Sequence, residues 1–107
     1  MRKDIRIDGA TGEVLDTERT IYVRRDKKRG GPDKVRWIIN GKSSLAPFRV
    51  HFAHSPFDAL ANAEDITVPS SGKSDTLTVA APVENYKYSI YDKDDNKTDD
   101  PSIIIVH

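Results

Sequence analysis

The sequence contains no cysteine, so it cannot form a disulfide, use a thiolate nucleophile or bind a metal through thiolate ligands. It also has no net charge, because 17 lysine and arginine residues balance 17 aspartate and glutamate residues, and this gives no overall attraction to nucleic acid or to an anionic membrane. No apolar run is long enough to cross a bilayer, and the first residues lack the apolar segment of a signal peptide. Together with the missing cysteines, these features lead us to expect a cytoplasmic protein that does not contact membranes.

What the chain does have is the length of one domain and a repeated pattern of period two. Its 107 residues suit a single compact domain, residues 1–107. Apolar residues alternate with polar or small ones in short segments, as in half-buried strands, and turn residues such as Asn40-Gly41 separate these segments. The clearest segments are 21–23, 35–39, 48–52, 77–79 and 86–90. The pattern predicts an all-β fold, a Greek-key β-sandwich of seven to nine strands.

The same pattern predicts the core and one short helix. The run at 103–106 is β-branched throughout and suits a strand that is covered on both faces. Ser55-Pro56-Phe57-Asp58 offers a capping serine, a proline at the first helical position and an acid two residues later, which predicts a helix over 55–61. The residues that we expect in the core are Val35, Trp37, Ile39, Val50, Phe52, Tyr86, Tyr88 and Ile104.

The charges are divided between the two halves of the chain. Residues 1–50 carry 13 basic and 7 acidic residues, whereas residues 51–107 carry 4 and 10. The basic excess peaks at Arg24, Arg25, Lys27, Lys28 and Arg29. Because no aromatic residue is interleaved there and only Tyr22 lies just upstream, we interpret the run as a solvated loop and a candidate surface for a protein partner, and we do not expect nucleic-acid binding. If the basic run and the acidic stretch 92–100 lie at opposite ends of the domain, weak head-to-tail contacts follow, with a monomer at moderate salt.

Two patterns raise the question of a metal. His51, His54 and His107 are a weak candidate set for copper or zinc, but residues three apart on a strand point to opposite faces, which favours surface histidines. The stretch 92–100 has oxygen ligands at alternate positions, yet Lys97 replaces the glycine of a calcium-binding EF-hand loop and Ile103 its glutamate. A polar hairpin loop is the simpler interpretation.

Nothing in the spacing of serine, histidine and acidic residues assigns a nucleophile and its base. Gly41-Lys42-Ser43 and Gly72-Lys73-Ser74 lack the earlier glycine of a phosphate-binding loop. We therefore predict that the protein is not an enzyme and needs no cofactor.

The order of segments resembles a cupredoxin-like sandwich. The strands that carry the resemblance are Val35-Arg36-Trp37-Ile38-Ile39-Asn40, Pro47-Phe48-Arg49-Val50 and Tyr86-Lys87-Tyr88-Ser89-Ile90. Phe48 stands where that family has a histidine ligand to copper, Ile90 where it has the cysteine, and the only methionine is Met1, so the resemblance implies no blue copper site. Together with Ser55-Pro56-Phe57 and the segment 100–105, these strands are similar to a group of small uncharacterised bacterial proteins with the same immunoglobulin-like sandwich and no copper.

Two functions remain open from the sequence. The first is a non-catalytic interaction module that binds a protein partner through loops or a sheet edge. The alternative is a metal-binding protein related to the cupredoxins that uses histidines in place of the lost ligands.

Overall fold

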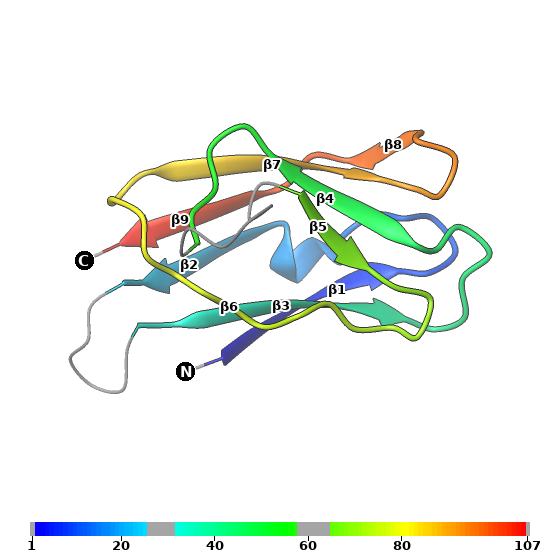
Figure 1. Ribbon diagram of the computed structural model, residues 1–107, viewed down its shortest axis with the longest axis horizontal. Coiled ribbons are helices and arrows are strands. Elements are labelled where there is room, and N and C mark those ends of the chain that lie inside the picture. The colour runs from blue at the N-terminus through cyan, green and yellow to red at the C-terminus, as the bar shows by residue number, and fades with distance from the viewer. Residues whose placement is uncertain (1, 26–31, 58–64, 107) are drawn as a thin grey trace.

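The residues described by a computed structural model, 2–25, 32–57 and 65–106, form nine strands and one turn of 3-10 helix (Figure 1). The helical turn, η1, spans Asp16–Glu18. The strands are β1 (Arg2–Asp8), β2 (Thr20–Arg24), β3 (Lys34–Asn40), β4 (Phe48–Phe52), β5 (Asp65–Val68), β6 (Leu77–Thr78), β7 (Asn85–Tyr91), β8 (Lys97–Asp99) and β9 (Ser102–Val106).

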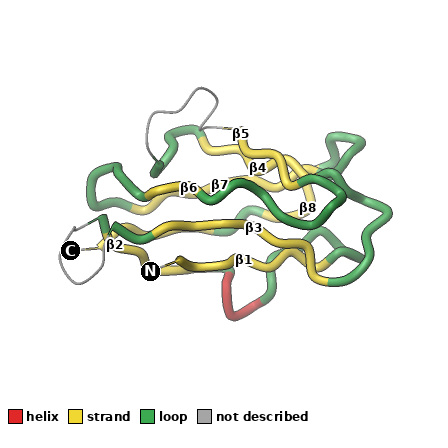
Figure 2. The backbone as a smooth tube through the Cα atoms, turned by 60° about the horizontal axis from the view of Figure 1, so that its bottom comes forward, coloured by secondary structure: helices red, strands yellow, loops and turns green. Residues whose placement is uncertain are grey.

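The strands are arranged in two sheets. The small sheet has the order β1-β3-β6, and the large sheet has the order β2-β9-β7-β4-β5, with β8 paired to β7. β1 runs parallel to β3 and β2 runs parallel to β9, while the other pairs are antiparallel. Figure 2 shows that the strands lie roughly along one axis of the molecule, with most of the loops at its two ends. The predicted all-β sandwich of seven to nine strands is confirmed.

The core lies between the sheets and is built from the alternate residues that the period-two pattern marks. Trp37 of β3 is fully buried and makes edge-to-face contacts with Phe52 of β4, Phe57 and Tyr88 of β7, with ring centroids 5.5 to 6.1 Å apart. The Trp37 indole Nε1–H donates to the Tyr88 hydroxyl at 3.4 Å, so the aromatic cluster also satisfies its buried polar groups. These contacts join the small sheet to the large one.

Seven of the eight predicted core residues contribute to the core, and they include Ile39, which has the parity of Val35 and Trp37 and packs against the core although it is only partly buried. Ile104 is the exception, and the reason is strand parity: it is only partly buried, whereas Ile103 and Ile105 are completely buried. β9 is therefore covered fully on one face only, and Ile104 points to the outer face of the large sheet. The other six predicted core residues are buried.

The predicted helix over 55–61 does not begin where the sequence suggested. Ser55 and Pro56 are not helical, and Phe57 pairs with Val79 in an isolated β-bridge. The Ser55 hydroxyl does accept the Phe57 amide at 3.2 Å, but this bond closes a local turn. Residues 58–61 lie outside the described part of the chain.

The position of Trp37 predicts a large loss of stability on truncation. Trp37→Ala should lower the free energy of unfolding by about 3 to 5 kcal/mol, because it empties the space between the sheets. Urea denaturation followed by circular dichroism measures the change, and Tyr22→Ala, which removes an exposed aromatic ring, should change it by less than about 0.5 kcal/mol. Equal stability of the two variants would show that Trp37 does not hold the sheets together.

Candidate functional site

The edge of the large sheet at β2 has unpaired backbone groups. Among the described strands, β2 pairs with β9 on one side only, and the Ser102 amide donates to the Arg19 carbonyl at 2.8 Å. In a parallel ladder every second residue bonds to the neighbouring strand, so the register of Ile21 with Ile103 assigns residues 19, 21 and 23 to β9. The N–H and C=O groups of Thr20 and Tyr22 therefore point away from β9, towards the open edge.

The two ends of this edge are closed by other parts of the chain. Next to the end of β2, the Arg24 amide donates to the Asp33 carboxylate at 3.0 Å, and the Asp33 amide donates to the Arg24 carbonyl at 2.8 Å. Before its start lies η1, which leads into Arg19. Thr20 and Tyr22 thus form a short open stretch between two closed ends, and we call it the β2 edge.

The side chains of the β2 edge face solvent. Tyr22 is 59% exposed, the more exposed of the two large hydrophobic residues on the described surface. It lies in register with Ile104 of β9, which is itself only partly buried, and Val106 is partly buried on the same face. An exposed aromatic ring beside two half-buried aliphatic side chains is a feature of protein contact surfaces.

The neighbouring edge of the small sheet is protected. Along β1, the Arg6 carbonyl accepts the Leu15 amide at 3.1 Å, and the Arg6 amide donates to the Glu18 carboxylate at 2.9 Å. The same carboxylate binds the Arg6 guanidinium through two bonds of 3.0 and 2.7 Å, which lowers the pKa of Glu18. Nearer the N-terminus, Asp4 forms ion pairs with Arg2 and Arg36. Charged and covered edges of this kind resist pairing with another chain.

Of the five basic residues proposed as a partner surface, the structure places two. Arg24 and Arg25 are both exposed at the end of β2, whereas Lys27, Lys28 and Arg29 lie outside the described residues. The positive charge of Arg25 acts on the Tyr86 hydroxyl, whose pKa is nevertheless raised, chiefly by burial and then by the charge of Glu84. Glu84 and Tyr86 both line a hollow in the described surface.

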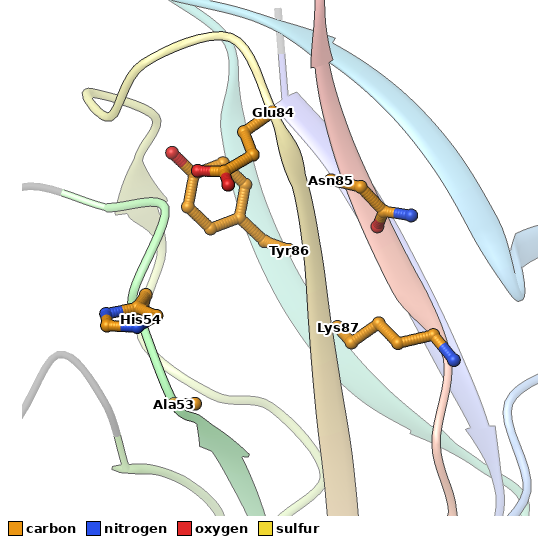
Figure 3. A pocket seen from close by; sticks show the side chains of 6 residues that line it. All are labelled: Ala53, His54, Glu84, Asn85, Tyr86 and Lys87. Carbon is orange, nitrogen blue, oxygen red and sulfur yellow. The ribbon is translucent and has the colours of Figure 1, made fainter.

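That hollow is a shallow pocket of about 220 Å³ between the end of β4 and the start of β7. Figure 3 shows His54 on one side of β7, while Asn85 and Lys87 extend on the other side, towards β9. The Tyr86 hydroxyl donates to the Pro82 carbonyl at 2.8 Å and so is held in place. The volume is below the roughly 300 to 1,000 Å³ typical of small-molecule sites.

The three histidines are not brought together by the described structure. The His51 Nδ1 atom lies 2.8 Å from the Asp65 carboxylate on the outer face of the large sheet, whereas His54 lines the pocket. His107 lies outside the described residues. Within the described ranges, no three histidine, cysteine or acidic side chains are grouped as metal ligands.

Sequence spacing did not reveal a row of polar residues across the outer face of the large sheet. His51 of β4 is in register with Asp65 of β5 on one side and with Ser89 of β7 on the other. Arg49 also binds Asp65, at 3.1 Å, and stacks on the Tyr91 ring at 4.4 Å. The hydrogen bond from His51 and then that from Arg49 lower the pKa of Asp65. Only the strand register reveals this row, because the three residues are distant in the sequence.

The acidic stretch 92–100 is divided between structural and exposed carboxylates. Asp92 is buried, and its Oδ1 atom accepts the amides of Asp94 and Asn96 at 2.9 and 3.0 Å. Asp99 binds the Arg19 guanidinium at 2.5 and 2.6 Å and accepts the Val14 amide at 2.9 Å. These bonds support the interpretation of a hairpin loop.

This acidic turn lies at the end of the sandwich opposite to Arg24, the last residue of β2 (Figure 1). Such a placement is the one that permits contacts between the basic end of one molecule and the acidic end of another. The weak head-to-tail association and the monomer at moderate salt stay predictions.

The chain was also compared with known proteins. No family model matches the sequence, and no curated protein is significantly similar to it. The site must therefore be judged on its own geometry.

The alternation along β2 predicts a pattern of hydrogen exchange. The amide of Tyr22 should exchange on the order of tenfold or more faster than those of Ile21 and Val23, because only the latter two donate into the sheet. Exchange measured by NMR on the 15N-labelled protein gives each rate separately. Equal protection at all three positions would mean that the outer side of β2 is bonded as well.

The ion pair that covers the β1 edge predicts a pH dependence. Folding lowers the pKa of Glu18, so its contribution to stability is present above the usual glutamate pKa of about 4.3 and is lost as the pH falls through the lowered value. Glu18→Gln should reduce the melting temperature at pH 7, and the difference from wild type should vanish at the lowest pH at which the protein stays folded. Asp75→Asn, which alters an exposed carboxylate, is the matched control. A difference for Glu18→Gln that is independent of pH would show that the charge of Glu18 does not matter.

Proposed function

We propose that this chain is a non-catalytic β-sandwich module that binds a protein partner through the β2 edge and the basic residues that follow it. The observation that carries the proposal is Tyr22, whose exposed ring and unpaired backbone groups lie on the same short stretch of an edge strand. An open strand edge is a ready template for pairing with another chain. Arg24 and Arg25 add a charged border that steers a partner of opposite charge.

The row of polar residues on the outer face of the large sheet does not favour a catalytic function. Asp65, His51 and Ser89 form a row, but the side chains of Asp65 and His51 are 48% and 42% exposed, and Arg49 competes for the same carboxylate. No described hydrogen bond joins His51 to Ser89, so the serine lacks the contact with a base that a nucleophile needs. The row also lies on an open sheet face, where water is not excluded from a reaction.

The proposal includes an evolutionary origin of the fold from a cupredoxin-like sandwich. Two features support a cupredoxin-like sandwich that has lost its copper: the parallel pairs β1–β3 and β2–β9 in opposite sheets, and the buried apolar side chains of Phe48 and Ile90 at the positions that the resemblance assigns to ligands. A bacterial source follows from the resemblance to small proteins of this kind. The module thus uses the sandwich as a scaffold and not as a metal site.

The cellular location is also a proposal, and we place the protein in the cytoplasm. The lack of cysteine fits a reducing compartment. Among the residues placed by the structure, no helix is long and apolar enough to span a membrane.

Site-specific photo-crosslinking tests the proposed binding surface. A photoreactive benzoylphenylalanine in place of Tyr22 should give one discrete cross-linked product in a bacterial extract. Excess unlabelled wild-type protein should reduce this product at least fivefold, whereas the variant Tyr22→Pro should compete poorly, because a proline blocks the edge.

The same probe in place of Thr67 is the matched control, since Thr67 is exposed on β5 at the opposite edge of the large sheet. Equal products from both positions, or products that the wild type does not compete away, would contradict the proposal.

A further inference from the structure

We infer that the partner segment is an extended, acidic peptide that joins the large sheet as an added antiparallel strand on β2. The inference rests on the proposed function, because it names the partner of the same surface. Three features of the molecule support it: the backbone groups of the β2 edge, the side chains around this edge and the charges at its end.

The number and spacing of free groups fit a short antiparallel strand. Thr20 and Tyr22 each present one N–H and one C=O to the edge, so each forms a pair in which two residues exchange both bonds. Two partner residues, themselves separated by one residue, would then receive these bonds. The partner residue between them lies opposite Ile21 and directs its own backbone groups away from β2.

The side chains next to the edge favour an apolar residue opposite Tyr22. Residues directly opposite in an antiparallel pair project from the same face, so the partner side chain would lie beside the Tyr22 ring. Ile104 is the next residue across the sheet and is only partly buried. A β-branched partner side chain would extend this apolar row by one strand.

The charges determine which end of the partner is acidic. β2 ends at Arg24, and Arg25 follows it directly. The two basic residues that the structure places, Arg24 and Arg25, are exposed at that end. In an antiparallel arrangement the residues that approach this end come before the apolar residue in the partner chain, so we place the acidic residues there.

A second copy of the chain fits this edge less well. Two-fold pairing centred on Tyr22 would set Thr20 of one copy opposite Arg24 of the other, and pairing centred on Ile21 would set Glu18 there. That place is taken by Asp33, which binds both the amide and the carbonyl of Arg24. The first pairing would also bring Arg19 towards Arg25 of the other copy, with charges of the same sign. A single extended segment whose pairing with β2 ends at Tyr22, and whose acidic residues continue beyond the paired stretch, avoids these conflicts.

The β1 edge fits the same partner less well. Its second half is covered through Arg6, and its first half carries the ion pairs of Asp4 without an exposed aromatic residue. An acidic peptide there would meet a carboxylate that is already bound to two arginines. The β2 edge is thus the better acceptor of an acidic strand.

The test uses the full 15N-labelled chain and a synthetic peptide, acetyl-Glu-Glu-Val-Thr-Val-Thr-amide. Saturating peptide should slow the amide exchange of Tyr22 at least tenfold, while Ile21 and Val23 stay as they were, since their amides already donate to β9. A peptide with lysine in place of both glutamates should bind at least tenfold more weakly. The variant Tyr22→Pro, checked to be folded by its NMR spectrum, should not bind.

Methylation of the peptide nitrogens tests strand addition without any change to the protein. N-methylation of the two valines should abolish binding and N-methylation of the central threonine should not, or the reverse if the register shifts by one, because only alternate amides face β2. Equal effects of both methylations, equal binding of the lysine peptide, or no change at Tyr22 would overturn the inference. Dimers of the free protein in sedimentation, dissociated by Tyr22→Pro, would assign the edge to a second copy instead.

The two proposals fail in different ways. A specific cross-link from position 22 without binding of the acidic peptide would refute the added acidic strand and leave the interaction module standing. Absence of both would refute the module as well.

Discussion

The packing of one tryptophan between the two sheets is the contact on which the rest of the fold depends. The small sheet has only three strands, and Trp37 in its middle strand touches aromatic rings from the large sheet and from the segment that follows β4. Its backbone is fixed as well, because the Trp37 amide donates to the Ser74 hydroxyl and the Trp37 carbonyl accepts the Ser74 amide, both at 2.9 Å. Every polar group of this residue is therefore satisfied inside the core, which rigid packing requires.

This anchored core sets the place of the β2 edge. Ile21 and Val23 of β2 are buried against the core, so the strand has one possible register with β9. A shift by one residue would expose both side chains and bury Tyr22. The same constraint that holds the sandwich together thus decides which backbone groups are left at the surface.

The fold was predictable from the sequence because the alternation of apolar and polar residues is a local signal. The outward position of Ile104 could not be predicted in this way, because the run 103–106 is apolar at every position. Only the pairing of β9 with β2 and β7 shows which of its faces is turned inward. The helix expected after Ser55 failed at its start because Phe57 is drawn into the aromatic cluster and pairs with Val79. Tertiary contacts override local capping signals in such cases.

The candidate site was harder to predict. The sequence pointed to the basic run and named Tyr22 only as an aromatic residue beside it. Nothing local shows that β2 is an edge strand, because its neighbour β9 lies some eighty residues further along the chain and runs parallel. The role of Asp99 likewise depends on distant contacts, such as the bond from Arg19.

The alternation along β2 has an evolutionary consequence. Residues 21 and 23 supply both the buried side chains and the ladder hydrogen bonds, whereas residues 20 and 22 supply neither. Selection for folding and selection for a partner therefore act on different positions of the same five-residue strand. Substitutions at 20 and 22 can change what the module recognises at little cost to its stability, so homologues with this sandwich can diverge in specificity while their cores stay the same.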